Sequence, residues 1–352
     1  MSRIYVPTLI VRERAAPPAR LTARVRPHYI RYEVGRYRDR LRSGPGGLGR
    51  ARVWTPERVG EQHNLLLDQA FDLIGAHGFG ALTAYAVVGT GSAAPATTDT
   101  GLGAEVARSN SIPSGEADAI TRVADGLWQV DRVREFTEAQ VGGQNLAEWG
   151  WAPGGTGGAA DLAVRELFRD GSNNPVVLSL AADQRLRLYY SQQVQFGPTT
   201  AQAASINIAN IGTLNGSFVI VKGSDSSGKN DWEFFDRFVR GDADYSYPFY
   251  YMKFGLHTNA LSTLYSDGTY GSAAAEQTLQ YQAYTTGSRQ RQTIQQLWGT
   301  SVVLTGITTL ALGWDYGSNN IGSQWIVRFV LNTPFDKDNL HKLYIDPWTI
   351  TW

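Results

Sequence analysis

Short runs of β-forming residues, each followed by a glycine-rich or polar turn, recur along this sequence and restrict its fold more than any other feature. Between Ile112 and Phe196 they return at the spacing of strands that cross a β-sandwich. The 38 glycines and many aromatic residues suit turns and pleated faces. We therefore predict a mainly β protein. The runs are Val130–Phe136, Leu146–Trp151, Leu162–Phe168 and Leu186–Tyr190.

The end of the chain repeats this order of runs. In both copies a Gly-Trp pair precedes a turn, and an arginine, Arg165 or Arg328, lies in the middle of the next run. Such repetition indicates duplicated modules, and it leaves open whether the chain holds one β-sandwich module or two. The corresponding runs are Leu146–Trp151 with Ile307–Trp314, Leu162–Phe168 with Trp325–Leu331, and Leu186–Phe196 with Leu343–Trp352.

A chain of 352 residues is long enough for two or three domains. The composition changes near residue 58 and again near residue 200. We predict an arginine-rich extended arm over residues 1–58, a helix with a β-sandwich module over 59–200, and a second β-rich module over 201–352.

Residues 60–108 are the most distinctive part of the chain. Apolar residues between 60 and 80 fall on one helical face, with Asn64 as a possible cap and Gly75 or Gly78 as the end of the helix. Leu82–Val88 predicts a strand, which ends at Gly-Thr-Gly-Ser. A small-residue loop follows, and residues 100–108 are predicted as a short helix capped by Asp99 or Thr100.

This region resembles structural proteins of tailed bacteriophages. The resemblance lies in Asn64-Leu-Leu-Leu-Asp68, then Val88-Gly-Thr-Gly-Ser92, Pro95 and Thr98-Asp-Thr-Gly-Leu102, and it covers about residues 60–110. Position 70 is alanine where the pattern has glycine. The resemblance implies a virion component, most often one encoded among the tail genes.

The first 58 residues are strongly basic. From residue 12 onward thirteen arginines face four carboxylates, and tyrosines are interleaved with them. Three interpretations remain open: an arm that docks on an acidic neighbouring subunit, which we favour, a nucleic-acid contact, and a solvated tail. The candidate intersubunit contacts here are Arg12, Arg14, Tyr29, Tyr32, Arg36 and Arg38.

A second candidate contact lies in the aromatic segment that follows Trp232–Arg240, a run that is predicted as either a strand or a short helix. Aromatic residues gathered in this way are typical of interfaces. The candidates are Tyr245, Tyr247, Phe249, Tyr250 and Tyr251.

Nothing in the sequence predicts catalysis, a cofactor or a metal. There is no cysteine and no GxSxG or HExxH motif, and Gly89-Thr-Gly91 lacks the remainder of a dinucleotide or P-loop fingerprint. Asp225, Asp242 and Asp244 do not follow the calcium-loop pattern. Net charge is zero, and no apolar run has membrane-spanning length.

The sequence therefore predicts a non-enzymatic virion structural protein, assembled in the host cytoplasm. We expect a homo-oligomer, a trimer or hexamer, in the tail, tail tip or head–tail junction, in contact with other virion proteins and with neither membrane nor nucleic acid. Two alternatives remain: a capsid decoration protein, and a receptor- or glycan-binding adhesin. The adhesin would use a platform of Trp149, Trp151, Trp232 and Trp314.

Overall fold

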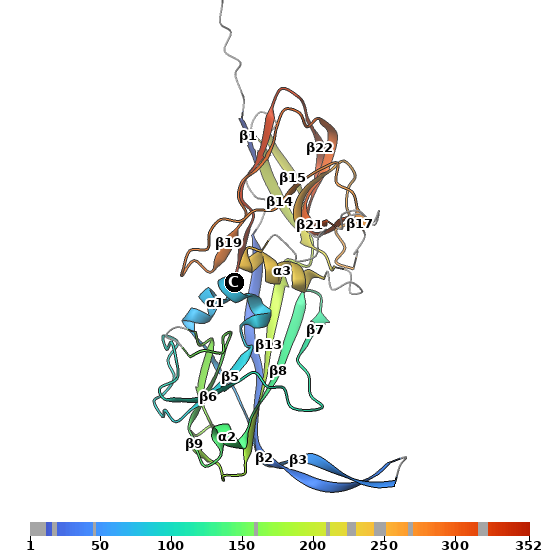
Figure 1. The fold of residues 1–352 in the computed structure, drawn as a ribbon. Helices are drawn as coiled ribbons and strands as arrows, with labels where there is room; N and C mark the ends of the chain where they lie inside the picture. Colours follow the sequence, from blue (N-terminus) through green and yellow to red (C-terminus); the bar gives the residue numbers. More distant parts are fainter. Residues whose placement is uncertain are drawn as a thin grey trace, which may run out of the picture. The chain divides into compact units, whose positions relative to one another are not determined.

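The computed structural model describes residues 12–15, 20–44, 47–157, 161–208, 212–223, 230–242, 251–266, 270–315 and 323–352. Among these residues, strands account for 54% and three helices for 10%, which confirms the predicted mainly β class (Figure 1). Residues 1–11 of the predicted arm lie outside the described residues.

The chain divides into two compact units, and each unit combines separate stretches of sequence. Unit 1 comprises residues 1–24, 124–127 and 195–352, and unit 2 comprises residues 25–123 and 128–194. Most of the arginine-rich segment predicted as a separate arm thus belongs to the same unit as the predicted first module.

Unit 2 is built mainly on two sheets. One has the order β4-β11-β10-β5-β6, and in the other β2, β13, β8 and β7 are successive neighbours, with β3 paired to β2. The strands are β2 (Leu21–Gly44), β3 (Gly47–Gln62), β4 (Leu65–Leu66), β5 (Tyr85–Gly89), β6 (Glu105–Ser109), β7 (Ala119–Ala124), β8 (Leu127–Phe136), β9 (Asn145–Leu146), β10 (Glu148–Ala152), β11 (Val164–Leu167), β12 (Leu178–Ser179) and β13 (Arg185–Gly197).

The helix predicted for residues 60–80 is shorter than expected. Helix α1 (Asp68–Ala81) begins after Leu67, not at Asn64, because residues 65–66 pair as β4 with β11. The Asp68 amide donates to the Thr97 carbonyl at 2.8 Å, so the helix N-terminus is satisfied by a distant loop and not by a side-chain cap. Gly78 has φ 79°, which breaks the helix near the predicted end.

The helix predicted for residues 100–108 is wrong. Residues 105–109 form β6, which pairs antiparallel with β5, for example Val87 with Arg108. Without β6 the buried strand β5 would leave one row of backbone groups unpaired, and this tertiary demand overrides the local helical signal. The second helix of unit 2, α2 (Glu138–Val141), is a single turn with a Thr137–Gln140 capping box.

Unit 1 contains one large sheet and smaller ones. The large sheet has the order β14-β15-β22-β21-β16-β18, with β17 paired to β22, and β1-β23-β20 form a three-stranded sheet. The strands are β1 (Arg12–Ala15), β14 (Gln202–Ile208), β15 (Gly212–Ile220), β16 (Tyr251–His257), β17 (Tyr270–Gly271), β18 (Ala275–Thr278), β19 (Gln290–Gln292), β20 (Gln296–Trp298), β21 (Leu304–Asp315), β22 (Ser323–Lys337), β23 (Lys342–Ile345) and β24 (Thr349–Thr351).

The run predicted as either a strand or a helix at Trp232 is helix α3 (Asp231–Arg240). The Asn230 side chain accepts the Glu233 amide at 2.9 Å, and Gly241 closes the helix in the left-handed conformation. One face of α3 is aromatic and packs on the large sheet, where the Phe234 and Trp314 rings meet edge-on at 6.0 Å. The Asn230 N-cap and the Gly241 C-cap explain why this run forms a helix and not a strand.

The two units share one strand topology. In unit 2 the chain runs β4, α1, β5, β6, β10, β11, and in unit 1 it runs β15, α3, β16, β18, β21, β22. The sheet orders, β4-β11-β10-β5-β6 and β15-β22-β21-β16-β18, are the same when the strands are matched in chain order. Every neighbouring pair is antiparallel in both sheets.

The register of the central strands repeats as well. Trp151 pairs with the residue after Tyr85, and Trp314 pairs with the residue after Tyr251. From that alignment β5 reads Tyr-Ala-Val-Val-Gly and the first five residues of β16 read Tyr-Met-Lys-Phe-Gly, so Tyr85 and Gly89 coincide with Tyr251 and Gly255. The two arginines do not coincide: Arg165 pairs with Gly150, whereas the residue that pairs with the corresponding Gly313 is Trp325, and Arg328 pairs with Ala311.

Candidate interaction surface

The long hairpin of β2 and β3 extends beyond the sheet of unit 2 (Figure 1). The segment is extended, as predicted, but its two halves pair with each other from Ile30–Gln62 to Gly44–Gly47. The neighbouring strand β13 has 13 residues against 24 in β2, so it is too short to flank the whole of β2. We call residues 38–44 and 47–53 the distal ribbon; in this part β2 and β3 have only each other as strand partners.

The base of the hairpin is anchored by buried charges and rings. Glu33, 3% exposed, accepts the indole N–H of Trp54 at 2.7 Å. The guanidinium of Arg187 lies 4.2 Å from the centroid of the Trp54 ring and donates to Glu135 at 2.8 Å. The Tyr37 hydroxyl also donates to Glu135, at 3.2 Å. This part of the hairpin is therefore fixed to the body of unit 2.

A bulge between Val34 and Gly35 interrupts the pairing of the two hairpin strands. A Cβ atom at Gly35 would lie 2.4 Å from the Thr55 carbonyl oxygen, so only glycine fits there. Just beyond it, Arg36 pairs with Glu57 and with Asp183, and Arg38 pairs with Glu57. Hydrogen bonds from Gln184, Arg38 and Arg36 lower the pKa of Glu57.

The distal ribbon is exposed and basic. Arg40 and Arg50 are exposed, and the side chain of neither forms a hydrogen bond or an ion pair with another described residue. Leu41 is 70% exposed and pairs in register with Arg50. The single carboxylate here, Asp39, lies opposite Arg52. Arg40 and Arg50 therefore present cations that pair with no carboxylate among the described residues.

The predicted contact residues fall into different environments. Arg36 and Arg38 lie at the start of the exposed ribbon, as described above. Tyr29 is 36% exposed, donates to Glu61 at 3.0 Å and lines a cleft of about 440 Å³ with His28, His63 and Asp170. Tyr32 is 6% exposed and packs edge-on against Phe168, so in unit 2 it serves as a core residue.

The remaining predicted contacts are less informative. Arg12 and Arg14 belong to β1, which pairs parallel with β23 in unit 1, and Tyr251, 38% exposed, begins β16. Four aromatic candidates lie outside the described residues: Tyr245, Tyr247, Phe249 and Tyr250.

The glycine-rich loop after β5 is organised by a buried carboxylate. Glu148, which is fully buried on β10, accepts the amides of Gly91, Gly103 and Ala104 at 3.0, 3.0 and 2.8 Å. Arg165 pairs with the same carboxylate at 2.8 Å. These loop amides, which could have bound a phosphate, are therefore occupied by an anion of the chain itself.

Asp99, in the middle of the same loop, completes this network. Its carboxylate accepts the Ala96 amide at 2.8 Å and pairs with Arg165. Burial acts to raise the pKa of Asp99, but the Ala96 hydrogen bond and the Arg165 charge together lower it. The loop from Gly91 to Ala104 is thus held in place by Glu148, Asp99 and Arg165.

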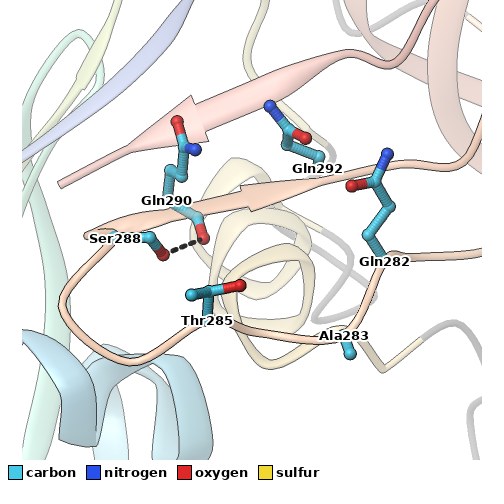
Figure 2. Close-up of a pocket in the computed structure, with 6 residues that line it drawn as sticks. All are labelled: Gln282, Ala283, Thr285, Ser288, Gln290 and Gln292. Carbon is cyan, nitrogen blue, oxygen red and sulfur yellow. Dashed lines mark hydrogen bonds between the residues drawn. The ribbon is translucent and has the colours of Figure 1, made fainter.

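Figure 2 shows a polar hollow of about 180 Å³ in unit 1, beside β19. Gln290 and Gln292 line it from the strand, and Gln282 lines it from the preceding segment. The Ser288 hydroxyl donates to the Gln290 carbonyl at 3.4 Å. The residues that line the hollow carry no charge.

The tryptophans proposed as a sugar platform are buried. Trp149, Trp151 and Trp314 are fully buried and Trp232 is 5% exposed, so none of them can stack on a ligand from solution. Within the described ranges no group of His, Asp and Glu is placed to hold a metal ion. None of the described helices is long and apolar enough to span a membrane.

Comparison with known proteins identifies no relative: no family model, no curated protein and no solved structure matches this chain.

Proposed function

We propose that this protein is a non-enzymatic structural subunit of a tailed-phage virion. It assembles as a symmetric multimer, a trimer or hexamer, in the tail, tail tip or head–tail junction, together with other virion proteins, after synthesis in the host cytoplasm. The distal ribbon is the observation that carries this proposal. A two-stranded ribbon is marginally stable alone in water, and its free edges can pair with or pack on another chain.

The resemblance at residues 60–110 supports the phage assignment in a specific way. Its glycines and Asp99 form the loop around Glu148 and Arg165. A pattern that encodes a folded loop points to a shared structural module.

We also propose that the chain contains two copies of one module. The support is the common order of five strands and one helix, together with the shared register of Tyr85 and Gly89 with Tyr251 and Gly255. A five-stranded order alone recurs by convergence, but agreement in both order and register favours duplication.

The assembly proposal can be tested by shortening the ribbon and leaving its base intact. Asp39 and Arg52 pair across the hairpin, so Asn-Gly can replace residues 40–51 as a two-residue turn between them. We expect the full chain to form a discrete oligomer by light scattering and the shortened chain to remain monomeric. A full-length chain that stays monomeric at every concentration would contradict the proposal.

Immunogold labelling of phage particles tests the location. Label on the tail is expected. Label confined to the capsid surface would favour the decoration protein, and unlabelled particles would refute the virion assignment.

The adhesin alternative now depends on the glutamine-lined hollow of Figure 2, since the tryptophans are buried. Binding of host polysaccharide that is lost in Gln290→Ala would favour it.

A further inference from the structure

The hairpin and the rest of unit 2 carry opposite charge. Residues 25–62 contain nine arginines and four carboxylates. The remainder of unit 2, residues 63–123 and 128–194, contains eight arginines and fourteen carboxylates. Unit 2 is thus close to neutral as a whole, but its charges are separated between a basic projection and an acidic body.

The hairpin already binds carboxylates of that body where it can reach them. Arg36 donates to Asp183 at 2.6 Å, and the Tyr37 hydroxyl donates to Glu135 at 3.2 Å. Farther out, the side chains of Arg40 and Arg50 are exposed and contact no carboxylate among the described residues. Arg40 and Arg50 therefore repeat the chemistry that fixes the base, but without a carboxylate partner among the described residues.

The distal ribbon is better suited to a protein surface than to nucleic acid. Arg40 pairs with Ala51 and Arg50 pairs with Leu41, so the two arginines project from opposite faces of the ribbon. Leu41, which is exposed, lies opposite Arg50, and Asp39 lies opposite Arg52 on the same face. On the other face Arg36 and Arg38, which share it with Arg40, are already paired with Glu57. A phosphate track would favour an unbroken row of free cations, whereas a mixed protein surface accommodates all of these groups.

We propose that the distal ribbon docks on the acidic body of unit 2 in a second copy of this chain. This inference rests on the proposed function and specifies its contact. Because a ribbon on one copy meets a body on the next, the contact is head-to-tail, so it generates a ring where the rotation closes and a filament where it does not. Charge attraction between exposed groups makes the association strongly dependent on ionic strength.

A mixing experiment separates this contact from a ribbon-to-ribbon contact. The shortened chain, with residues 40–51 replaced by Asn-Gly, retains the acidic body but lacks the distal ribbon. Added in excess to the full-length chain, it is expected to bind the free ribbons and reduce the oligomer to smaller complexes, measured by light scattering with mass analysis. Failure to form mixed complexes would overturn the inference.

Charge reversal provides the matched test. Arg40→Glu/Arg50→Glu is expected to weaken self-association at least about tenfold at low salt, and by less at high salt. The control, Arg20→Glu/Arg24→Glu, reverses two exposed arginines outside the hairpin and should leave the association constant unchanged. Oligomers that persist unaltered in the first variant would overturn the ribbon contact but leave the structural function standing. A full-length chain that never self-associates would refute both.

Discussion

Glu148 and Arg165 form a 2.8 Å ion pair in the interior of unit 2, and the loop that follows β5 is built around this pair. Glu148 has no exposed surface, and its oxygens receive three backbone amides in addition to the guanidinium. The pair therefore links β10 to β11, and it also holds the loop after β5 in place.

Removing the charge of Glu148 should destabilise unit 2. Breaking one side of a buried pair typically costs about 3–5 kcal/mol, because the remaining charge stays desolvated. In Glu148→Gln the amide NH2 group would also face backbone donors. We expect a loss of that order in urea unfolding. Glu276→Gln, which breaks the more exposed pair with Lys253, should change stability by less than about 1 kcal/mol.

The loop glycines offer a sharper test of the same site. A Cβ atom at Gly91 would lie 2.3 Å from the Glu148 carboxylate, whereas a Cβ atom at Gly101 meets nothing within 4 Å. Gly91→Ala should therefore destabilise the protein by about 1–3 kcal/mol, the usual cost of overpacking. Gly101→Ala, in the same loop, should have little effect. Equal losses in the two variants would contradict the described packing.

Loosening the base of the hairpin should expose the ribbon to proteases. Arg187 stacks on Trp54 and donates to both Glu135 and Tyr37, and a lysine cannot reproduce that planar set of contacts. In Arg187→Lys we expect trypsin to cleave at Arg50 and Arg52 several-fold faster than in the parent chain. Arg24→Lys, at an exposed position, is the control, and cleavage at the parental rate in Arg187→Lys would contradict the anchoring role.

Acid should weaken unit 2 through Asp118. Burial acts to raise its pKa, but the Arg134 hydrogen bonds and the charges of Arg132 and Arg134 lower it below 3.8. A lowered folded-state pKa gives stability that is present above the unfolded value and lost as pH falls through the folded value. The free energy of unfolding should therefore decrease as the pH is lowered below about 4. In Asp118→Asn this fall should be smaller, with lower stability at neutral pH.

The sequence predicts the strands better than their ends and better than the caps of helices. The runs Val130–Phe136 and Trp325–Leu331 fall inside β8 and β22 because β-branched and aromatic residues continue through them. Residues 100–108 are predicted as a helix although residues 105–109 form β6, because nothing local shows that β5 needs a partner on that side. The shortening of the helix at residue 68 depends likewise on pairing with β11, which is distant in sequence.

The candidate surface was predictable in its charge but not in its form. The count of arginines before residue 58 indicates a contact region, and alternation at Arg36, Arg38 and Arg40 is compatible with a strand. The pairing of residues 30–44 with 47–62 was missed, although Ser43-Gly-Pro-Gly-Gly47 is a turn signal between two extended segments. The role of Glu148 has no sequence signal at all, because its three amide donors come from residues far away along the chain.

Unit 1 pairs strands from the first residues of the sequence with strands from the last ones, and this affects when its sheets can form during synthesis. Leu21 pairs with Ile350, and Arg12 pairs with Lys342, in parallel. A ribosome must therefore release residue 351 before these sheets can close, and the early strands wait while some 330 further residues are synthesised. During that interval β1 and the start of β2 have open edges, which can pair with other chains.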